Sequence, residues 1–234
     1  MLEIDSVSAG YGNQQVLHGV SMSLAPGQMV AVLGPNGHGK TTLLRCISGM
    51  VHATSGHIRL DRHDITGRRI DEIVQRGIVH IPQGDMIFPQ MSVIENLLMG
   101  AYLENNRATV EKRLEQVYAL LPRLRERHRQ IANTLSGGER RMLAIGRGLM
   151  SGGRTLLVDE PSLGLAPLVI DQIYRVLAEL KGEGRAILLV EENASRVAAE
   201  ADLVYLLDDG RIVWQGQSQQ LWENTELIET YLGG

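Results

Sequence analysis

A glycine-rich segment near the start of the chain constrains its fold more than any other feature. Residues 34–42 read GPNGHGKTT and fit the pattern G-x-x-x-x-G-K-[ST]. The apolar, β-prone run 29–33 precedes this segment, and residues 43–47 read as the opening of a helix. A strand, a glycine-rich loop and a helix in this order form a P-loop, in which backbone N–H groups and the positive end of the helix dipole surround phosphate oxygens. The sequence therefore predicts a nucleotide site.

The P-loop pattern also assigns roles to its residues. Lys40 is expected to reach the β- and γ-phosphates, and the Thr41 hydroxyl is expected to bind Mg²⁺. The side chain of His38 is expected to point outward while its backbone N–H binds phosphate. The residues of this segment expected to contact the nucleotide are Gly34, Asn36, Gly37, His38, Gly39, Lys40, Thr41 and Thr42.

Composition indicates a globular protein without a membrane-spanning segment. Of the 234 residues, 44% are hydrophobic and 21% are charged, so a packed core is expected. A net charge of −4 argues against nucleic acid or an anionic membrane surface as the main partner. The N-terminus does not resemble a signal peptide, and no apolar run approaches the ~20 residues that span a bilayer. We therefore expect a soluble, cytoplasmic protein that reaches a membrane only through a partner.

Hydrophobic periodicity divides the chain into sheet-forming parts and a helical part. Strands are expected at 2–7, 16–24, 57–60, 78–81, 155–158 and 186–190, with a hairpin at 203–214. Helices are expected at 168–180 and 194–201, and residues 92–151 show helical periodicity with a stop or restart at Pro122. Because strands alternate with helices on both sides of the helical block, we expect an α/β fold with a parallel-sheet core, an N-terminal antiparallel β subdomain and a helical lobe.

Two adjacent carboxylates end the predicted strand 155–158. In parallel sheets the carboxyl ends of the strands face the ligand crevice. Asp159 is therefore expected to bind Mg²⁺, directly or through water, and Glu160 to act on the water that attacks the γ-phosphate. Gln83 follows the predicted strand 78–81, and Tyr11 could stack on a base.

A second glycine pair lies in the string LSGGE at residues 135–139, just before a predicted helix. A serine and two glycines at a helix start make a second anion-binding turn, formed by Ser136, Gly137 and Gly138. One γ-phosphate does not need two such turns from one subunit. The second turn is therefore expected to serve the nucleotide of a neighbouring subunit.

Together, the P-loop, the LSGGE string and the acidic strand end resemble the ATP-binding-cassette (ABC) ATPases over essentially the whole chain. The resemblance implies one ABC ATPase domain, 1–234, with a RecA-like P-loop NTPase core and β subdomain at 1–91 and 152–234. The helical lobe with the signature motif would span 92–151. It also implies a head-to-tail dimer, homo- or heteromeric, that holds two ATP molecules with Mg²⁺. Each ATP would lie between the P-loop of one subunit and the signature string of the other.

The resemblance also assigns roles outside the P-loop. Tyr11 matches the residue that stacks on adenine. Gln83 matches the residue that senses Mg²⁺ and the membrane partner, so it is expected both as a metal ligand and among the catalytic residues with Glu160 and Lys40. The region Gln83–Leu98 is expected to contact permease subunits.

Three sequence strings that are less specific than LSGGE resemble those of the cassettes of branched-chain amino acid importers. They are the strings DEPSLGLAP at 159–167, VEEN at 190–193 and YLGG at 231–234. This resemblance implies an ATP-hydrolysing subunit of an importer for branched-chain or related amino acids, held at the inner face of the plasma membrane by permease subunits. An importer cassette for urea or amides is an alternative, because the membrane subunits and a binding protein read the substrate.

Glu192 departs from the usual cassette pattern, because most cassettes carry a switch histidine at this position. A carboxylate there would face the γ-phosphate with the wrong charge unless it were protonated or turned away. A second hypothesis is therefore an ATP-gated scaffold subunit with weak hydrolysis in a heterodimer.

Two other classes are disfavoured. The interval 83–135 reads as a compact lobe rather than the long insertion of a DNA-associated cassette, and the chain is acidic. A GTPase is disfavoured because no N-K-x-D string occurs.

Within the lobe, Met99 is expected to pack in the core because of its helical spacing.

Overall fold

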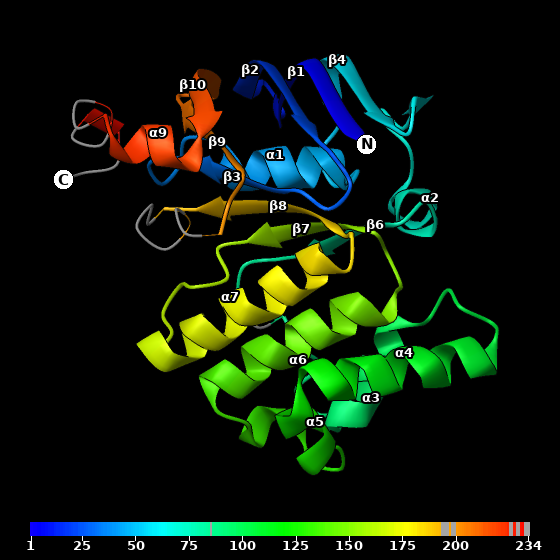
Figure 1. Cartoon of the computed structure of the whole chain (residues 1–234). Coiled ribbons are helices and arrows are strands. Elements are labelled where there is room, and N and C mark those ends of the chain that lie inside the picture. The colour runs from blue at the N-terminus through cyan, green and yellow to red at the C-terminus, as the bar shows by residue number, and fades with distance from the viewer. Residues whose placement is uncertain (85, 193–196, 198–199, 225–226, 228–229, 232–234) are drawn as a thin grey trace.

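The computed structural model describes residues 1–84, 86–192, 197, 200–224, 227 and 230–231. The chain folds as an α/β protein with two sheets and a group of helices, as the sequence predicts (Figure 1). Parts of two sequence features lie outside the described residues. These are most of the predicted helix 194–201, with Asn193 before it, and the terminal residues 232–234.

A six-stranded sheet forms the centre of the molecule, with strand order β10-β9-β3-β8-β7-β6. Its parallel strands are β6 (Ile78–Ile81), β7 (Thr155–Asp159), β8 (Ala186–Glu191), β3 (Met29–Leu33) and β9 (Leu203–Asp208). The edge strand β10 (Arg211–Gln217) is antiparallel to β9. Strands β3, β7 and β8 are buried at every residue, which explains their continuous apolar runs.

A four-stranded antiparallel sheet covers one face of the molecule, with order β2-β1-β4-β5. It contains β1 (Leu2–Tyr11), β2 (Gln14–Leu24), β4 (Ala53–Leu60) and the short β5 (His63–Asp64). Helix α1 (Lys40–Ile47) lies between the two sheets (Figure 1). Its buried leucines share one apolar cluster with Ile4 of β1 and Val30 of β3.

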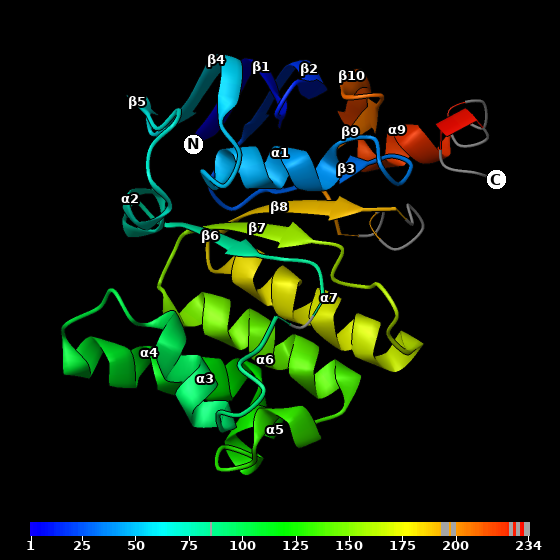
Figure 2. The same cartoon turned by 180° about the vertical axis from the view of Figure 1, so that it is seen from behind.

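The helices of the 92–151 region lie on the opposite face of the six-stranded sheet (Figure 2). They are α3 (Val93–Gly100), α4 (Arg107–Leu120), α5 (Pro122–Glu126), the 3₁₀ helix η1 (Ala132–Thr134) and α6 (Gly137–Met150). Helix α7 (Pro167–Gly182) packs beside α6, while α2 (Ile70–Gln75) and α9 (Ser218–Trp222) are short peripheral helices. Pro122 begins α5 directly after α4 ends, because proline fits the first turn of a helix but not its interior.

One continuous apolar cluster joins these helices to the sheet. It includes Leu97 of α3, Val117 of α4 and Ile145 of α6 together with Leu156 of β7. The division at 91/92 and 151/152 stays a prediction, because the buried side chains run across it. The expectation for Met99 is wrong: its side chain is 39% exposed at the end of α3. Within the described part of the chain, no helix combines the length and the apolar character needed to cross a membrane.

Candidate nucleotide-binding site

The P-loop connects the end of β3 to the start of α1, as the sequence predicts. Two of its glycines are required by their surroundings. A Cβ at Gly34, whose φ is +155°, would lie 2.0 Å from the carbonyl oxygen of Leu207 on β9. A Cβ at Gly39, with φ +105°, would lie 2.9 Å from Cδ2 of Leu17 on β2. Glycine therefore lets the loop lie closely against β9 and β2.

Lys40 is buried at the centre of the loop, with 4% of its surface exposed. Its Nζ donates to the carbonyl oxygens of Gly34 at 2.7 Å and Pro35 at 3.0 Å, and it lies 3.9 Å from Oε1 of Glu160. Burial lowers the pKa of Lys40, and the nearby carboxylate of Glu160 opposes this shift. A buried ammonium held by neutral carbonyl groups can bind phosphate oxygens as charge-assisted partners, so these residues fit a triphosphate.

Thr41 and Asp159 meet beside the loop. Thr41 Oγ1 donates to Asp159 Oδ1 at 3.2 Å, and Asp159 is 1% exposed. Burial raises the pKa of the Asp159 carboxyl. No group of three or more His, Cys, Asp or Glu side chains that could hold a metal ion occurs among the described residues. The hydroxyl of Thr41 and the carboxylate of Asp159 nevertheless suit Mg²⁺, which is commonly held by one or two protein oxygens together with phosphate oxygens.

Gln83 and Glu160 are brought together from the ends of two neighbouring strands. Gln83 Nε2 donates to Glu160 Oε2 at 2.8 Å. Glu160 is 7% exposed and has a left-handed backbone conformation, with φ +41°. Such a conformation is uncommon for a residue other than glycine and is found often at functional sites. The carboxylate thus lies between the ammonium of Lys40 and the amide of Gln83.

Glu192 lies next to the P-loop, at the end of β8. Its Oε2 accepts a hydrogen bond of 2.9 Å from Asn36 Nδ2, and its side chain is exposed. The preceding residue, Glu191, is 3% exposed and accepts from the backbone N–H of Ser162 at 3.0 Å and from Tyr174 Oη at 3.2 Å. Sequence reasoning missed Glu191, although two carboxylates at a strand end repeat the pattern of 159–160.

His38 contacts the turn between β9 and β10. Its Nδ1 lies 2.7 Å from Asp208 Oδ1, and its carbonyl oxygen accepts from the N–H of Gly210 at 3.1 Å. These turn residues, 208–210, were predicted as a hairpin but not as neighbours of the P-loop. The ring of His38 therefore contacts Asp208 and the backbone N–H of Asp209, and phosphate binding by its own backbone N–H stays a prediction.

Tyr11 ends β1 and is 44% exposed, with its hydroxyl accepting from Arg45 Nη1 at 3.2 Å. An exposed ring beside Arg45 of α1 is compatible with base stacking, which stays a prediction. The remaining predicted P-loop contacts, Gly37 and Thr42, lie in the loop and in the first turn of α1. The side chain of Thr42 is buried.

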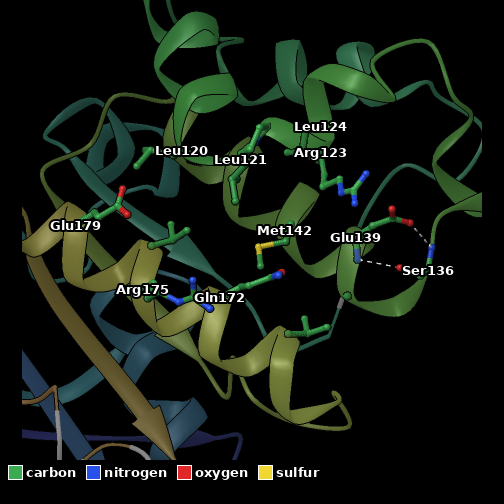
Figure 3. Close-up of a pocket in the computed structure, with 14 residues that line it drawn as sticks. Leu120, Leu121, Arg123, Leu124, Ser136, Glu139, Met142, Gln172, Arg175 and Glu179 are labelled. Atoms are coloured by element: carbon green, nitrogen blue, oxygen red, sulfur yellow. Dashed lines mark hydrogen bonds between the residues drawn. The ribbon is translucent and has the colours of Figure 1, made fainter.

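The signature residues cap α6. Ser136 Oγ accepts from the N–H of Glu139 at 3.3 Å, and Glu139 Oε2 accepts from the N–H of Ser136 at 2.9 Å (Figure 3). A Cβ at Gly138 would lie 2.8 Å from Val169 of α7, so this helix start packs closely on its neighbour. Helix α6 and the P-loop helix α1 belong to apolar clusters on opposite faces of the sheet. Within one chain, Ser136, Gly137 and Gly138 are thus separated from the P-loop.

A cavity of about 500 Å³ opens between α7, α6 and the α4–α5 corner (Figure 3). Leu121, Leu124 and Met142 form part of its apolar wall, and Arg123 and Glu179 lie at its polar edge. It includes Ser136 and Gly138 but none of the P-loop residues. The charged groups Lys40, Asp159 and Glu160 converge at the P-loop and do not line this cavity, so the P-loop remains the candidate nucleotide site.

Comparison with known proteins agrees with this geometry. A family model described as ABC transporter matches residues 17–163. The chain is 42% identical to the high-affinity branched-chain amino acid transport ATP-binding protein BraG of Pseudomonas aeruginosa, over 100% of both chains. It is 33% identical to the lipopolysaccharide export system ATP-binding protein LptB of Acidithiobacillus ferridurans, over 100% of this chain and 97% of that protein.

Solved structures give the same result. The ADP conformation of an ATP-binding cassette of an ABC transporter superimposes with a TM-score of 0.89 at 28% identity, over 100% of this chain and 99% of that chain. A nucleotide-free cassette gives a TM-score of 0.88 at 27% identity, over 98% and 97%. The resemblance to the branched-chain amino acid subfamily is thus confirmed, and the chain belongs to the ABC transporter family as a nucleotide-binding ABC ATPase.

Proposed function

We propose that this chain is the ATP-hydrolysing subunit of an importer for branched-chain or related amino acids. The observation that carries the proposal is the position of Glu160, held between Lys40 and Gln83 and next to the Thr41–Asp159 pair. The importer assignment is supported by the 42% identity to BraG. Similarity to export cassettes such as LptB leaves the transported substrate as the finer part of the proposal.

Each residue of the site has a defined task in this proposal. ATP with Mg²⁺ supplies the γ-phosphoryl group that is transferred to water. Lys40 would bind the phosphate oxygens, and the oxygens of Thr41 and Asp159 would hold Mg²⁺, with Gln83 as a further metal ligand. Glu160 accepts a proton from the attacking water, and Gln83 keeps its carboxylate in position. The backbone of Gly37 and Gly39 surrounds the phosphates, and Tyr11 stacks on the base.

The general-base role of Glu160 is tested by Glu160→Gln. This change keeps the shape of the side chain and the bond from Gln83, and it removes the basic oxygen. ATP binding is expected to persist while hydrolysis falls by about 10²–10⁴-fold. Lys40→Ala, in contrast, is expected to lose tight ATP binding. Wild-type turnover by Glu160→Gln would exclude this residue as the base.

A head-to-tail dimer is proposed as well, and the separation of the signature residues from the P-loop within one chain supports it. Each ATP would contact the P-loop of one subunit and Ser136, Gly137 and Gly138 of the other. The test mixes two inactive variants, Lys40→Ala and Ser136→Glu. A mixed dimer contains one site with both defects and one intact site, so activity is expected to return on mixing. If the two motifs served the same chain, mixing would restore nothing.

The region Gln83–Leu98 is proposed to receive a cytoplasmic helix of a permease. A groove of about 300 Å³ adjoins this region, and its lining includes the exposed side chains of Phe88, within the region, and Met99, just after it. The Arg147 guanidinium stacks 5.0 Å from the centre of the Phe88 ring. An apolar groove beside a cation suits an amphipathic helix. This contact would hold the protein at the inner face of the membrane.

Cysteine crosslinking tests the groove in the assembled transporter. A cysteine at Phe88 or Met99 is expected to react with a permease loop, whereas a cysteine at exposed Trp222 of α9 is the control. Crosslinks only within this chain would count against the groove. Uptake of labelled leucine or urea by the reconstituted complex then separates the two substrate classes.

A scaffold subunit with weak hydrolysis is the second candidate, and Glu192 is the observation that favours it. Its carboxylate is held at the P-loop by Asn36 and carries the charge opposite to that of a protonated histidine. The test is single-turnover hydrolysis by Glu192→His in the heteromeric complex. A faster rate at this subunit's site would support the scaffold reading, and an unchanged rate would show that position 192 does not limit the enzyme.

A further inference from the structure

Arg141 is a buried cation between the helical lobe and the candidate catalytic residues. It lies in the second turn of α6, five residues after the N-cap Ser136, and is 2% exposed. Five residues of α-helix rise about 7.5 Å, so the guanidinium is carried on the same rigid element as the signature residues.

The guanidinium of Arg141 donates to three backbone carbonyl groups outside its own helix. Nη1 donates to the carbonyl oxygens of Pro82 at 2.7 Å and Gly84 at 2.5 Å, and Nη2 donates to that of Asp159 at 2.8 Å. The first two carbonyl groups flank Gln83 on both sides. The third directly precedes Glu160. Arg141 thus fixes the backbone at the two residues whose side chains are joined by the 2.8 Å bond between Gln83 Nε2 and Glu160 Oε2.

We propose that Arg141 is a positioning residue for ATP hydrolysis, which aligns Gln83 with Glu160 by holding the backbone next to each of them. The proposal rests on the proposed roles of these two residues. An arginine suits this task because its planar guanidinium presents several donors in fixed directions, whereas a lysine ammonium is a single point charge on a flexible stem. Arg141 also links the signature end of α6 to the segment that opens the permease groove.

The positioning role predicts a loss of rate that exceeds any loss of affinity for ATP. Arg141 donates to the carbonyl oxygen of Asp159, the proposed Mg²⁺ ligand, so the affinity is measured for ATP without Mg²⁺. Displacing a catalytic group by about 1 Å can lower a rate by roughly 100-fold. Loss of the three hydrogen bonds from the Arg141 guanidinium is therefore expected to lower kcat while the affinity for ATP stays within about threefold of the wild type.

The test compares Arg141→Lys and Arg141→Gln with the wild-type chain in ATP binding, thermal stability and steady-state hydrolysis. Both variants are expected to bind ATP and to lose about 10- to 100-fold in kcat. Arg185→Lys is the matched control. Arg185 Nη1 also donates to a backbone carbonyl, that of Gly153 at 2.6 Å, but at the opposite end of β7. Its variant is expected to keep the wild-type kcat.

A double variant distinguishes positioning from general destabilisation. Because Arg141 holds the backbone beside both Gln83 and Glu160, Arg141→Lys combined with Gln83→Ala is expected to lose less in kcat than the product of the two single losses. Multiplicative losses, or a wild-type kcat in folded Arg141→Lys and Arg141→Gln, would overturn the inference. Glu160→Gln distinguishes a failure of the positioning role from a failure of the proposed function. If Glu160→Gln hydrolyses ATP slowly while Arg141→Lys is as fast as the wild type, only the positioning role of Arg141 is rejected. If Glu160→Gln is as fast as the wild type, the proposed function itself is rejected.

Discussion

Gly210 tests whether the hairpin turn between β9 and β10 supports the P-loop. Its N–H donates to the carbonyl oxygen of His38 at 3.1 Å, and its own carbonyl accepts from the N–H of His18 at 2.9 Å. Its φ is +70°, and an added Cβ would lie 1.9 Å from the carbonyl oxygen of Val16. Gly210→Ala therefore combines backbone strain with an overlap that no side-chain movement can relieve.

The size of the effect follows by comparison with Gly67, whose φ is +66° and whose Cβ would meet no atom within 4 Å. An alanine in the left-handed region costs roughly 1–2 kcal/mol, and the stiffer unfolded chain offsets about 0.4–1 kcal/mol of this. Gly67→Ala is thus expected to lose about 1 kcal/mol. Gly210→Ala adds an overlap worth about 1–3 kcal/mol and weakens two backbone hydrogen bonds worth about 0.5–1.5 kcal/mol each. Together with the strain of about 1 kcal/mol, the expected loss is about 3–7 kcal/mol if both hydrogen bonds are lost.

Urea unfolding measures both losses, with the slope m checked for a change in the unfolding reaction. ATP affinity is measured on the same samples under folding conditions. Gly210→Ala is expected to bind ATP more weakly than Gly67→Ala, because the backbone of His38 loses its anchor. Equal free energies of unfolding for the two variants would refute the argument, since their φ strain is matched and they differ in the contacts with Val16 and His18 and in the two backbone hydrogen bonds of Gly210.

The remaining predictions concern buried groups and one helix end. Burial raises the pKa of Glu191 above its ordinary value of 4.5, so the folded chain holds a proton that the unfolded chain releases. The free energy of unfolding is then expected to fall as the pH rises from about 4.5 through the pKa of the folded state. Glu191→Gln is expected to be more stable than the wild type only above this pH range. Urea titrations at several pH values would show the difference. Gly182→Ala, at the end of α7 with no atom within 4 Å of the new Cβ, is expected to gain about 0.5–1 kcal/mol in the same assay. Burial raises the pKa of the Cys46 thiol to about 11, so iodoacetamide at pH 8 is expected to modify it only after unfolding; rapid labelling of the native protein would contradict this.

The elements that sequence reasoning predicted well are those with a single dominant local signal. Strand β3 is a continuous apolar run between a turn and a glycine-rich loop, and α5 begins at a proline. Strand β1 was predicted to end at residue 7 but runs to Tyr11, with irregular register against β2 and Ser6 in a left-handed conformation. Such bulges break the alternation of apolar and polar residues, so the periodicity stops before the strand does.

Contacts between distant segments could not be predicted in this way. The motifs identified Lys40 and Glu160 because their chemistry depends on short, ordered strings. The clamp from Arg141 to the backbone beside Gln83 depends on how α6 packs against the sheet. Met99 follows a helical spacing that predicts burial, yet it faces the groove, because periodicity does not reveal which apolar face is covered by the same chain.

The charged side chains around Lys40 determine how strongly the proposed hydrolysis depends on Mg²⁺. Burial lowers the pKa of Lys40, and four carboxylates oppose that shift: Glu160, Glu192, Asp159 and Glu191. These four acids outnumber the ammonium of Lys40 and the guanidinium groups of Arg45 and Arg141, which also act on Asp159. A triphosphate adds further negative charge, so Mg²⁺ is expected to supply balancing charge. Replacing Glu192 by histidine removes one acid, frees the Asn36 amide and adds a hydrogen-bond donor. The gain in rate from Glu192→His is therefore expected to be largest at low Mg²⁺, where the surplus charge is least compensated.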